Sequence, residues 1–275
     1  MPSQSIELTN YLYYLSSISV ELTFIGLNSW LLNVDGLQIL IDPWLVDAIV
    51  FYGSPWMFEA KHVTPPCYTP ASLPSIDLIL ITQSLDDHCH QPTLAKLSKQ
   101  IPVVTAPSAV KIVESLGYDR VIRLAPWETY ILNERVEITA TPGAKIQTTL
   151  ENGFLVKSLQ TSKTLYYEPH LATDRQTIDR LSKQAKIDTI IAPIVGQIFP
   201  LLGKVIMNAQ DAFQLATALQ PQWYLPTATG EIDVKGILPQ LTKSDGSIDE
   251  FSQLLAQSKL STQLLMPQPG ETVSV

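Results

Sequence analysis

Residues Ile79–Thr93 read ILITQSLDDHCHQPT and combine a strand, a polar turn and the start of a helix. The apolar run Leu78–Thr82 is typical of a buried strand, and Pro92 suits the first turn of a helix. The turn between them holds four side chains that bind metals or protons, namely Asp86, Asp87, His88 and His90. Carboxylates and imidazoles crowded at the end of a strand predict a divalent-metal site. The alternative is that they cap the helix and face water.

Strand and helix signals alternate on both sides of this stretch. Asp35-Gly36 is a strong two-residue turn signal and predicts a hairpin between Trp30–Val34 and Leu37–Ile41. Further strands are expected at Val20–Ile25, Val103–Ala106, Val121–Leu124, Glu128–Leu132, Val136–Ala140, Phe154–Leu159, Thr164–Tyr167, Thr189–Ala192 and Trp223–Pro226. Helices are expected at Pro92–Lys99, Ser108–Leu116, Thr173–Gln184 with Thr173 as N-cap, Asn208–Leu219 with Asn208 and Asp211 close to a capping box, and Ile248–Gln257. Hairpins and strand–helix units in both halves predict two sheets packed face to face with helices outside, in a single domain over residues 1–275.

Residues Val46–Ser75 form the longest irregular stretch. The stretch is rich in proline and carries Phe51, Tyr52, Trp56, Phe58 and Tyr68. A loop of this length inside a compact domain is usually functional or disordered, and this one is too aromatic for disorder. We therefore expect a lid or pocket wall at residues 46–75. The alternative is a loop packed over the core with no ligand beneath it.

The overall composition bears on partners and compartment. The chain has 275 residues, of which 45% are hydrophobic, and a formal net charge of −8. Nucleic-acid binding needs a basic face, so this balance argues against a nucleic-acid partner. No apolar run is long enough for a transmembrane segment, and Met1–Val20 lack the pattern of a signal peptide. Two cysteines, Cys67 and Cys89, make no disulfide framework, so we expect a reducing, cytoplasmic compartment.

Taken in order, several motifs resemble the metallo-β-lactamase fold, and within it the UlaG-like group of metal-dependent hydrolases. Ile79–His88 stands where that group has T-H-x-H-x-D-H. The other matching segments are Leu22–Leu45 (hairpins ending in DPW), Thr141–Gly143, Glu151–Phe154 (ENGF), Tyr166–His170 (YYEPH), Met207–Ala212 and Pro269–Thr272 (PGET). The resemblance runs from about residue 20 to the C-terminus. It implies an α/β (α+β) fold, a four-layer αββα sandwich with a metal site at one sheet edge. The pair S-L-D-D-H-C-H and Y-Y-E-P-H resembles a cyanobacterial and plant-type subgroup, which implies a photosynthetic source.

The same resemblance implies an altered, degenerate metal site. The positions of the family's ligand and turn histidines carry Gln83, Leu85, Ala144, Ala228 and Leu27, and the bridging aspartate falls at Glu168. Leucine and alanine cannot coordinate a metal, and glutamine is a weak neutral ligand. Of the family's ligands, Asp87 and His88 survive.

Two functions remain open on this evidence. The first is a metal-dependent hydrolase with a relocated, at most mononuclear site for one divalent Zn, Mn or Fe. Its metal ligands are Asp87, His88, Glu168 and His170, with Asp86 and His90 in reserve. Asp87 is also the candidate catalytic residue, as general base. The motivating observation is that the chain has only four histidines, and three of them lie in two loops that this fold brings together.

The second function is a catalytically inactive fold member, with no metal, that binds a hydrophobic small molecule. Replacing histidines by leucine and alanine makes the pocket more apolar, and mostly apolar concavities suit small molecules. The candidate substrate-binding residues are Gln83, Leu85, Leu27, Trp44, Trp56 and Ala228. In both cases the partner is a small molecule, and phosphoesters, lactones and thioesters all occur as substrates in the superfamily.

Structural roles are the alternative for several candidates. Asp86 is expected to cap a turn, His90 to be a solvated residue at a helix start, and His62 to lie on the surface. Cys89 is adjacent to His88, but no third group is evident that would orient such a pair for nucleophilic catalysis. A buried, unreactive thiol is therefore expected at Cys89.

Overall fold

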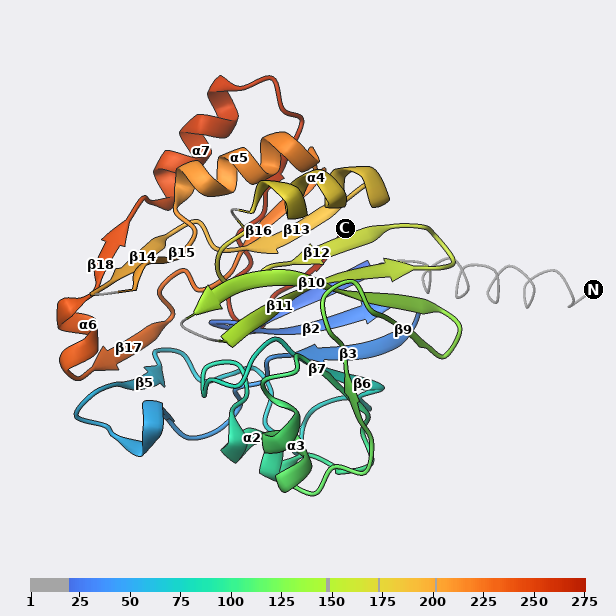
Figure 1. Ribbon diagram of the computed structural model, residues 1–275, viewed down its shortest axis with the longest axis vertical. Helices are drawn as coiled ribbons and strands as arrows, with labels where there is room; N and C mark the ends of the chain where they lie inside the picture. Colours follow the sequence, from blue (N-terminus) through green and yellow to red (C-terminus); the bar gives the residue numbers. More distant parts are fainter. Residues whose placement is uncertain (1–19, 147–148, 173, 201) are drawn as a thin grey trace, which may run out of the picture.

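The computed structural model describes residues 20–146, 149–172, 174–200 and 202–275. Within these residues, two seven-stranded sheets pack face to face, and helices cover their two outer surfaces (Figure 1). The predicted αββα sandwich is therefore confirmed. No helix in the described part of the chain is long and apolar enough to cross a membrane.

The first sheet contains the N-terminal hairpins and the strand that precedes the polar turn Asp86–His90. Its strands, in sheet order, are β20 (Thr272–Ser274), β1 (Val20–Gly26), β2 (Ser29–Val34), β3 (Leu37–Ile41), β6 (Leu78–Ile81), β7 (Val103–Thr105) and β8 (Val121–Arg123). The predicted β2–β3 hairpin is confirmed, because Val34 pairs with Leu37 across the turn. Asp35 and Gly36 have φ values of 52° and 76°, the left-handed pair that a type I′ turn requires. From β3 to β8 the strands run parallel.

The second sheet has the same plan. Its strands, in sheet order, are β19 (Gln263–Leu264), β16 (Trp223–Pro226), β13 (Thr189–Ala192), β12 (Thr164–Tyr167), β11 (Thr149–Ser158), β10 (Val136–Ile146) and β9 (Thr129–Leu132). β9 to β12 form antiparallel hairpins, and β12 to β19 run parallel. Parallel strands direct their C-terminal ends to one sheet edge, which is where ligands bind in such sheets.

Helices cover the outer face of each sheet (Figure 1). The first sheet carries α2 (Gln91–Lys96) and α3 (Val110–Ser115), and the second carries α4 (Arg175–Gln184), α5 (Ala209–Leu219) and α7 (Ile248–Gln257). The core has three layers. One lies between the sheets around Trp30, Phe154 and Tyr167, and the other two lie under the two sets of helices. This alternation of apolar layers is what the strand–helix pattern of the sequence encodes.

Two helix caps test the sequence signals directly. The capping box of α5 is confirmed, since Asn208 Oδ1 accepts from the Asp211 N–H at 2.9 Å and Asp211 accepts from the Asn208 N–H at 3.1 Å. The sequence predicts that α4 starts with Thr173 as its N-cap, which is one residue too early. The helix begins at Arg175 with Asp174 as its N-cap, and Thr173 lies outside the described residues. Both residues are good caps, and a carboxylate can accept two backbone N–H groups at once.

The stretch 46–75 is more regular than its sequence indicates. It contains β4 (Ile49–Val50), the short 3₁₀ turn η1 (Phe51–Gly53) and β5 (Glu59–His62), which pairs with β17 (Ile232–Lys235) far along the chain. A second small sheet consists of β14 (Gly196–Phe199), β15 (Gly203–Ile206) and β18 (Lys243–Asp245), and α6 (Ile237–Leu241) joins β17 to β18. These additions lie beside the sandwich (Figure 1). They carry much of the cavity wall described below.

Candidate metal centre

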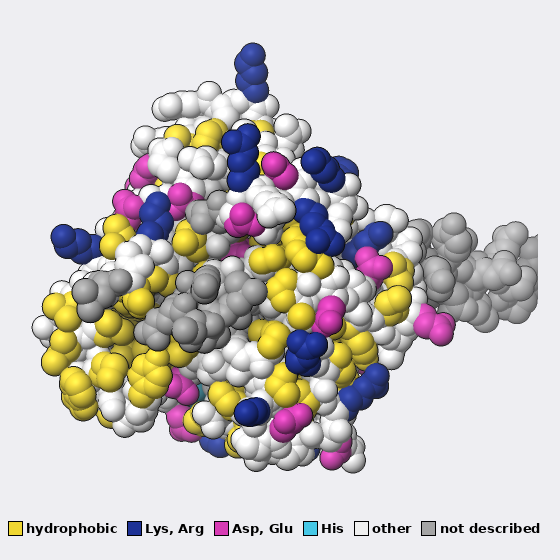
Figure 2. All heavy atoms as spheres, viewed as in Figure 1, with side chains coloured by type: hydrophobic (Ala, Val, Ile, Leu, Met, Phe, Trp, Pro, Cys, Tyr) yellow, Lys and Arg dark blue, Asp and Glu magenta, His cyan; other side chains and the backbone are white. Residues whose placement is uncertain are grey.

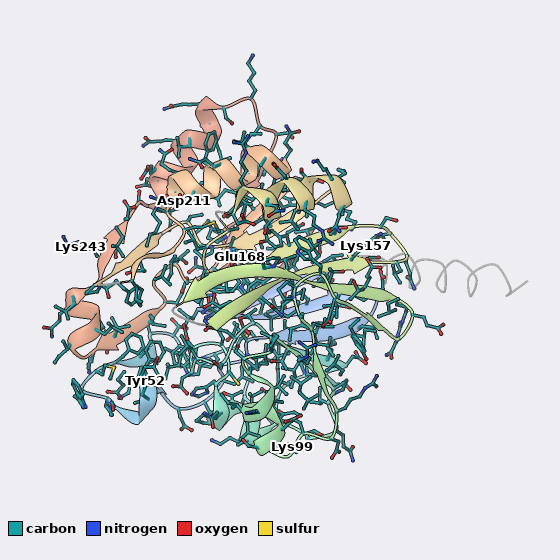
Figure 3. All side chains as sticks on the ribbon, in the orientation of Figure 1. Tyr52, Lys99, Lys157, Glu168, Asp211 and Lys243 are labelled. Atoms are coloured by element: carbon teal, nitrogen blue, oxygen red, sulfur yellow. The ribbon has the colours of Figure 1, made fainter. Side chains whose placement is uncertain are left out.

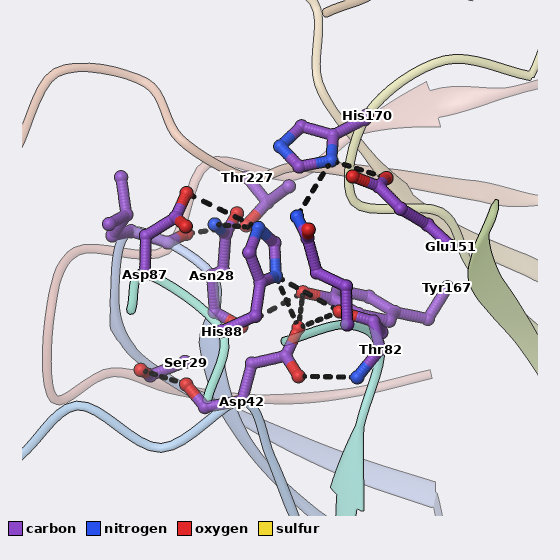
Figure 4. A network of polar contacts seen from close by, with 12 residues as sticks. Asn28, Ser29, Asp42, Thr82, Asp87, His88, Glu151, Tyr167, His170 and Thr227 are labelled. Atoms are coloured by element: carbon purple, nitrogen blue, oxygen red, sulfur yellow. Dashed lines mark hydrogen bonds and ion pairs between the residues drawn. The ribbon is translucent and has the colours of Figure 1, made fainter. Parts of the chain in front are cut away.

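Three predicted ligand residues converge at the C-terminal ends of parallel strands. Asp87 and His88 follow β6 of the first sheet, and His170 follows β12 of the second. One ligand atom from each lies within 4.8 Å of the other two. The two imidazole rings meet edge to face at a centroid distance of 4.8 Å. The cluster therefore joins the two sheets at a single edge (Figure 4).

A buried carboxylate holds the Nδ1 atom of His88. Asp42 Oδ2 lies 2.7 Å from that nitrogen, and Asp42 has no exposed surface. Asp42 also accepts hydrogen bonds from the Thr82 hydroxyl at 2.6 Å, the Thr82 N–H at 2.9 Å and the Tyr167 hydroxyl at 3.2 Å. With Nδ1 engaged, the free atom of the His88 ring is Nε2. It lies 3.3 Å from Asp87 Oδ2 and 3.2 Å from Asn28 Nδ2.

A second buried carboxylate holds His170 in the same way. Glu151 Oε2, from β11, lies 2.6 Å from His170 Nδ1. The Gln83 side-chain nitrogen approaches the same atom at 3.5 Å. Figure 4 shows the His170 ring beside Asp87 and His88, with its other ring nitrogen on the side away from Glu151. Each of the two histidines is thus left with Nε2 as its free ring nitrogen, because a carboxylate occupies its Nδ1 atom.

The charges of Asp42, Asp87 and His88 affect one another. Burial opposes a charge on His88, but the carboxylates of Asp87 and Asp42 outweigh burial and raise its pKa well above the usual range. Burial also opposes the charge of Asp87, yet the neighbouring His88 lowers the pKa of its carboxyl group. The two carboxylates therefore favour the protonated form of His88. A divalent cation at this point would take the place of the proton on Nε2.

The donor set fits a divalent metal. It offers two imidazole nitrogens and one carboxylate, a combination used by catalytic zinc sites and by mononuclear iron sites. Asp87 Oδ1 is buried and has no hydrogen-bond partner among the described residues, so the carboxylate has an unused ligand atom. Carboxylates on the distal nitrogens of ligand histidines are the usual support of a metal centre, because they fix the tautomer and the ring orientation.

Glu168 lies beside the cluster but its carboxylate is not one of the converging atoms. It accepts hydrogen bonds from the Tyr166 hydroxyl at 2.9 Å and from the His170 N–H at 3.2 Å. Burial raises the pKa of Glu168 to about 7. Its side chain has no exposed surface, and Figure 3 labels it near the middle of the view. These contacts indicate that Glu168 stabilises the segment that carries His170.

The two reserve ligands, Asp86 and His90, are not part of the cluster. His90 is buried rather than solvated, and its ring nitrogens lie 2.9 Å from the Thr93 hydroxyl and 3.4 Å from the Ala48 carbonyl oxygen. Asp86 is half-buried, and burial followed by the charge of Asp87 raises its pKa. Neither side chain belongs to the three-residue cluster. Cys89 is buried as expected, and burial raises the pKa of its thiol to about 12.

A cavity of about 300 Å³ adjoins Asp87 and His170. Two predicted substrate-binding residues, Gln83 and Leu85, line it, and so do Phe51 and Tyr52 from the stretch 46–75.

The other four predicted substrate-binding residues are not among the residues that line the cavity. Trp44 has no exposed surface and stacks on His62 at a centroid distance of 3.5 Å, so His62 is not the free surface residue that we expected. Trp56 is 65% exposed. The backbones of Leu27 and Ala228 bond to each other, the Ala228 N–H donating to the Leu27 carbonyl at 3.0 Å.

Sequence reasoning did not assign Asp42 and Glu151, although both lie in motifs that it quoted. Asp42 begins the DPW segment and Glu151 begins ENGF. The available signal was a carboxylate beside or within an apolar strand, since a buried carboxylate needs partners. Pattern alone does not reveal whether such a group binds a metal or a histidine. Only the register of β11 against β12 brings Glu151 to His170.

Comparisons with known proteins agree with this architecture. Residues 21–228 match the family model described as the beta-lactamase superfamily domain. A UPF0173 metal-dependent hydrolase of Thermodesulfovibrio yellowstonii is 26% identical, and the match covers 94% of this chain and 92% of that protein.

Two solved structures share the fold at low sequence identity. An isothiocyanate hydrolase from Delia radicum gut bacteria superposes with a TM-score of 0.72 at 17% identity, covering 92% of this chain and 98% of its own. A possible metal-dependent hydrolase from Veillonella parvula gives a TM-score of 0.74 at 15% identity, with coverages of 94% and 100%.

Proposed function

The chain belongs to the beta-lactamase superfamily, and from this premise we propose that it is a metal-dependent hydrolase with one divalent metal at Asp87, His88 and His170. One observation carries the proposal. Each histidine has its Nδ1 atom held by a buried carboxylate, which leaves Nε2 as its free ring nitrogen, and one ligand atom from each histidine and from Asp87 lies within 4.8 Å of the other two. The names of the relative and of the two fold neighbours, all hydrolases, support the reaction class.

Three protein ligands leave a coordination position open, as in catalytic rather than structural sites. When bound, the metal supplies a Lewis acid and a water of lowered pKa. The donor set suits Zn, Mn or Fe. The proposal requires one equivalent of one of these metals per protein chain.

The residues of the chain have separable tasks in this proposal. Asp42 and Glu151 fix the orientation of the two imidazoles, which is a positioning role. Asp87 would be a ligand through one oxygen, and its Oδ1, which has no hydrogen-bond partner in the described part of the chain, would accept the proton that the attacking water loses. The leaving group then receives its proton from Asp87 or from solvent. Glu168 positions the His170 segment through its bond to the His170 N–H.

The finer assignments from the sequence are also proposals. The ordered motifs from Leu22 to Thr272 support membership of the UlaG-like group and a cyanobacterial or plant-type source. An exposed free thiol at Cys67 supports a reducing compartment such as the cytoplasm. The partner in this proposal is a small-molecule substrate. We do not propose the metal-free binding module, because three ligand-type side chains with supporting carboxylates would then have no role.

The test is the metal content of the protein, purified without added metal and without a histidine tag. We expect about one equivalent of Zn, Mn or Fe by mass spectrometry, lost in His88→Ala and in His170→Ala. Asp86→Asn is the matched control, because it changes the adjacent carboxylate, which lies outside the cluster, and should retain the metal. Absence of metal after incubation with each ion in turn would overturn the proposal.

A further inference from the structure

The cavity beside the metal centre has two unlike parts. The part that adjoins the centre is polar, with Gln83, Ser84, Asp87 and His170. The remaining wall is made of hydrocarbon and aromatic side chains, among them Phe51, Met57, Leu85, Phe199, Ile206 and Leu238. Its volume of about 300 Å³ is at the lower end of the range for ligand pockets. A molecule placed there would have a polar end at the metal centre and an apolar body against the wall.

The charge of the wall is decisive for the kind of substrate. Among the lining residues that the structure describes, none is lysine or arginine, and the single carboxylate is Asp87. Lys204, on the nearby hairpin, is paired with Asp211 at 2.7 Å. An anionic group in the apolar part would lose its hydration and find no cation in return, which is strongly unfavourable. The wall therefore selects against charge at a distance from the reacting bond.

The wall belongs mainly to the segments outside the two large sheets. Phe199 and Ile206 come from the β14–β15 hairpin, Leu238 from α6 and Phe51 from η1. Tyr52 and Leu202 line the cavity and are also 71% and 45% exposed, so both side chains contact the cavity and the solvent.

Hydrophobic side chains also gather on the surface near this opening. Figure 2 shows them over α6 and β17, and the exposed residues there include Ile237 and Leu241. Figure 3 shows Tyr52 at the edge of the same region. An apolar molecule would thus meet apolar surface before it reaches the cavity.

We propose that the substrate joins its hydrolysable bond to an uncharged, apolar acyl or aryl group that fills this cavity. Substrates with a charged group at that end, such as sugar phosphates and nucleotides, are rejected. This proposal rests on the proposed hydrolase function for the reaction, but the cavity's preference is a property of the wall and is measurable without turnover.

The binding test uses unreactive ligands of equal chain length that end in a methyl group or in a carboxylate. By titration calorimetry on the full-length protein, 1-octanol should bind at least about tenfold more tightly than 8-hydroxyoctanoate, whose carboxylate would enter the apolar part. Along 1-butanol, 1-hexanol and 1-octanol, affinity should rise about fourfold per methylene until the cavity is full. Equal affinity for octanol and hydroxyoctanoate, or no binding of any alcohol, would overturn the proposal.

A charge swap in the wall provides a second test. Leu238→Lys places a cation in the cavity lining and should reverse the preference, strengthening 8-hydroxyoctanoate and weakening 1-octanol. Leu241→Lys is the matched control, because Leu241 is on the same helix, is 55% exposed and is not a lining residue. It should leave both affinities unchanged. A reversal in both variants would mean that surface charge, not the cavity, governs binding, and would refute the proposal.

Hydrolysis separates this inference from the function on which it rests. The ester 4-nitrophenyl hexanoate should be cleaved at least about tenfold faster, as kcat/KM, than the 4-nitrophenyl monoester of hexanedioic acid. If both are cleaved equally, the hydrolase stands and the inference fails. If neither is cleaved while the alcohols bind as expected and Leu238→Lys reverses the preference, the cavity inference stands and the hydrolase proposal fails for esters.

Discussion

Replacing Glu151 should weaken metal binding without unfolding the protein. Glu151 is fully buried, and its Oε2 lies 2.6 Å from His170 Nδ1. Its Oε1 has no hydrogen-bond partner among the described residues. The carboxylate therefore has one evident task, which is to hold the His170 ring.

The size of the effect follows from that single contact. Glu151→Gln keeps an acceptor for His170 Nδ1 but removes its charge, and a charge-assisted bond is about twice as strong as a neutral one. The difference is about 1–1.5 kcal/mol, or a factor of about 5–12 in the metal dissociation constant. Glu151→Ala removes the acceptor altogether and leaves a buried donor unpaired, so we expect a loss approaching about 100-fold.

The assay is competition for Zn²⁺ with a chromogenic chelator, read beside the urea midpoint of the metal-free protein. Stability should fall only modestly in Glu151→Gln, because the glutamine side-chain oxygen still accepts the hydrogen bond of His170 Nδ1. Glu168→Gln is the control and should keep the affinity within about threefold, because its side chain is outside the cluster and the glutamine oxygen still accepts from the His170 N–H. Unchanged zinc affinity in both Glu151 variants, or a larger loss in Glu168→Gln, would refute the assignment of Glu151 and return Glu168 to the ligand set.

Three further predictions concern stability and pH. Gly153→Ala should cost about 1–3 kcal/mol and lower Tm by several degrees, because a Cβ at residue 153 would stand 2.6 Å from Thr141 Oγ1. Burial lowers the pKa of His62 from 6.5 to about 4, so the folded state binds fewer protons than the unfolded chain across this interval and stability falls as pH drops from 6.5 to 4. The full shift would correspond to about 3 kcal/mol, and partial exposure reduces it to about 1–2 kcal/mol; His62→Phe, which can still stack on Trp44, should flatten Tm against pH in that window. Asn208→Ala should cost about 1 kcal/mol in urea unfolding through loss of the α5 cap.

The parts of the fold that could be predicted are those whose signals are local. Asp35-Gly36 determines its own turn geometry, and Asn208 with Asp211 determines the start of α5. The small sheets could not be predicted in the same way. Ile232 pairs with His62 across the length of the chain, and both strands have only four residues. Pairing of such short strands depends on tertiary contacts that neither segment shows in isolation.

The ligand residues of the candidate centre could be named from the sequence because histidine is rare in this chain and the fold places two loops together. The supporting carboxylates are different in kind. Asp42 and Glu151 act through hydrogen bonds to Nδ1 atoms, and those bonds exist only after the sheets have formed. Glu168 is the opposite case, since the resemblance places it at the family's bridging aspartate while its side chain accepts hydrogen bonds from the Tyr166 hydroxyl and the His170 N–H.

The altered motif and the apolar cavity have one physical origin in our proposal. The resemblance places Gln83 and Leu85 at positions where the family has ligand histidines, and the structure places both in the cavity lining. A leucine cannot hold a metal, but it removes a polar group from the wall and adds hydrocarbon next to the reacting bond. In our proposal, Asp87, His88 and His170 hold one metal, and Leu85 forms part of the apolar wall of the adjoining cavity. The same leucine that cannot bind a metal is then a residue that an apolar substrate group contacts.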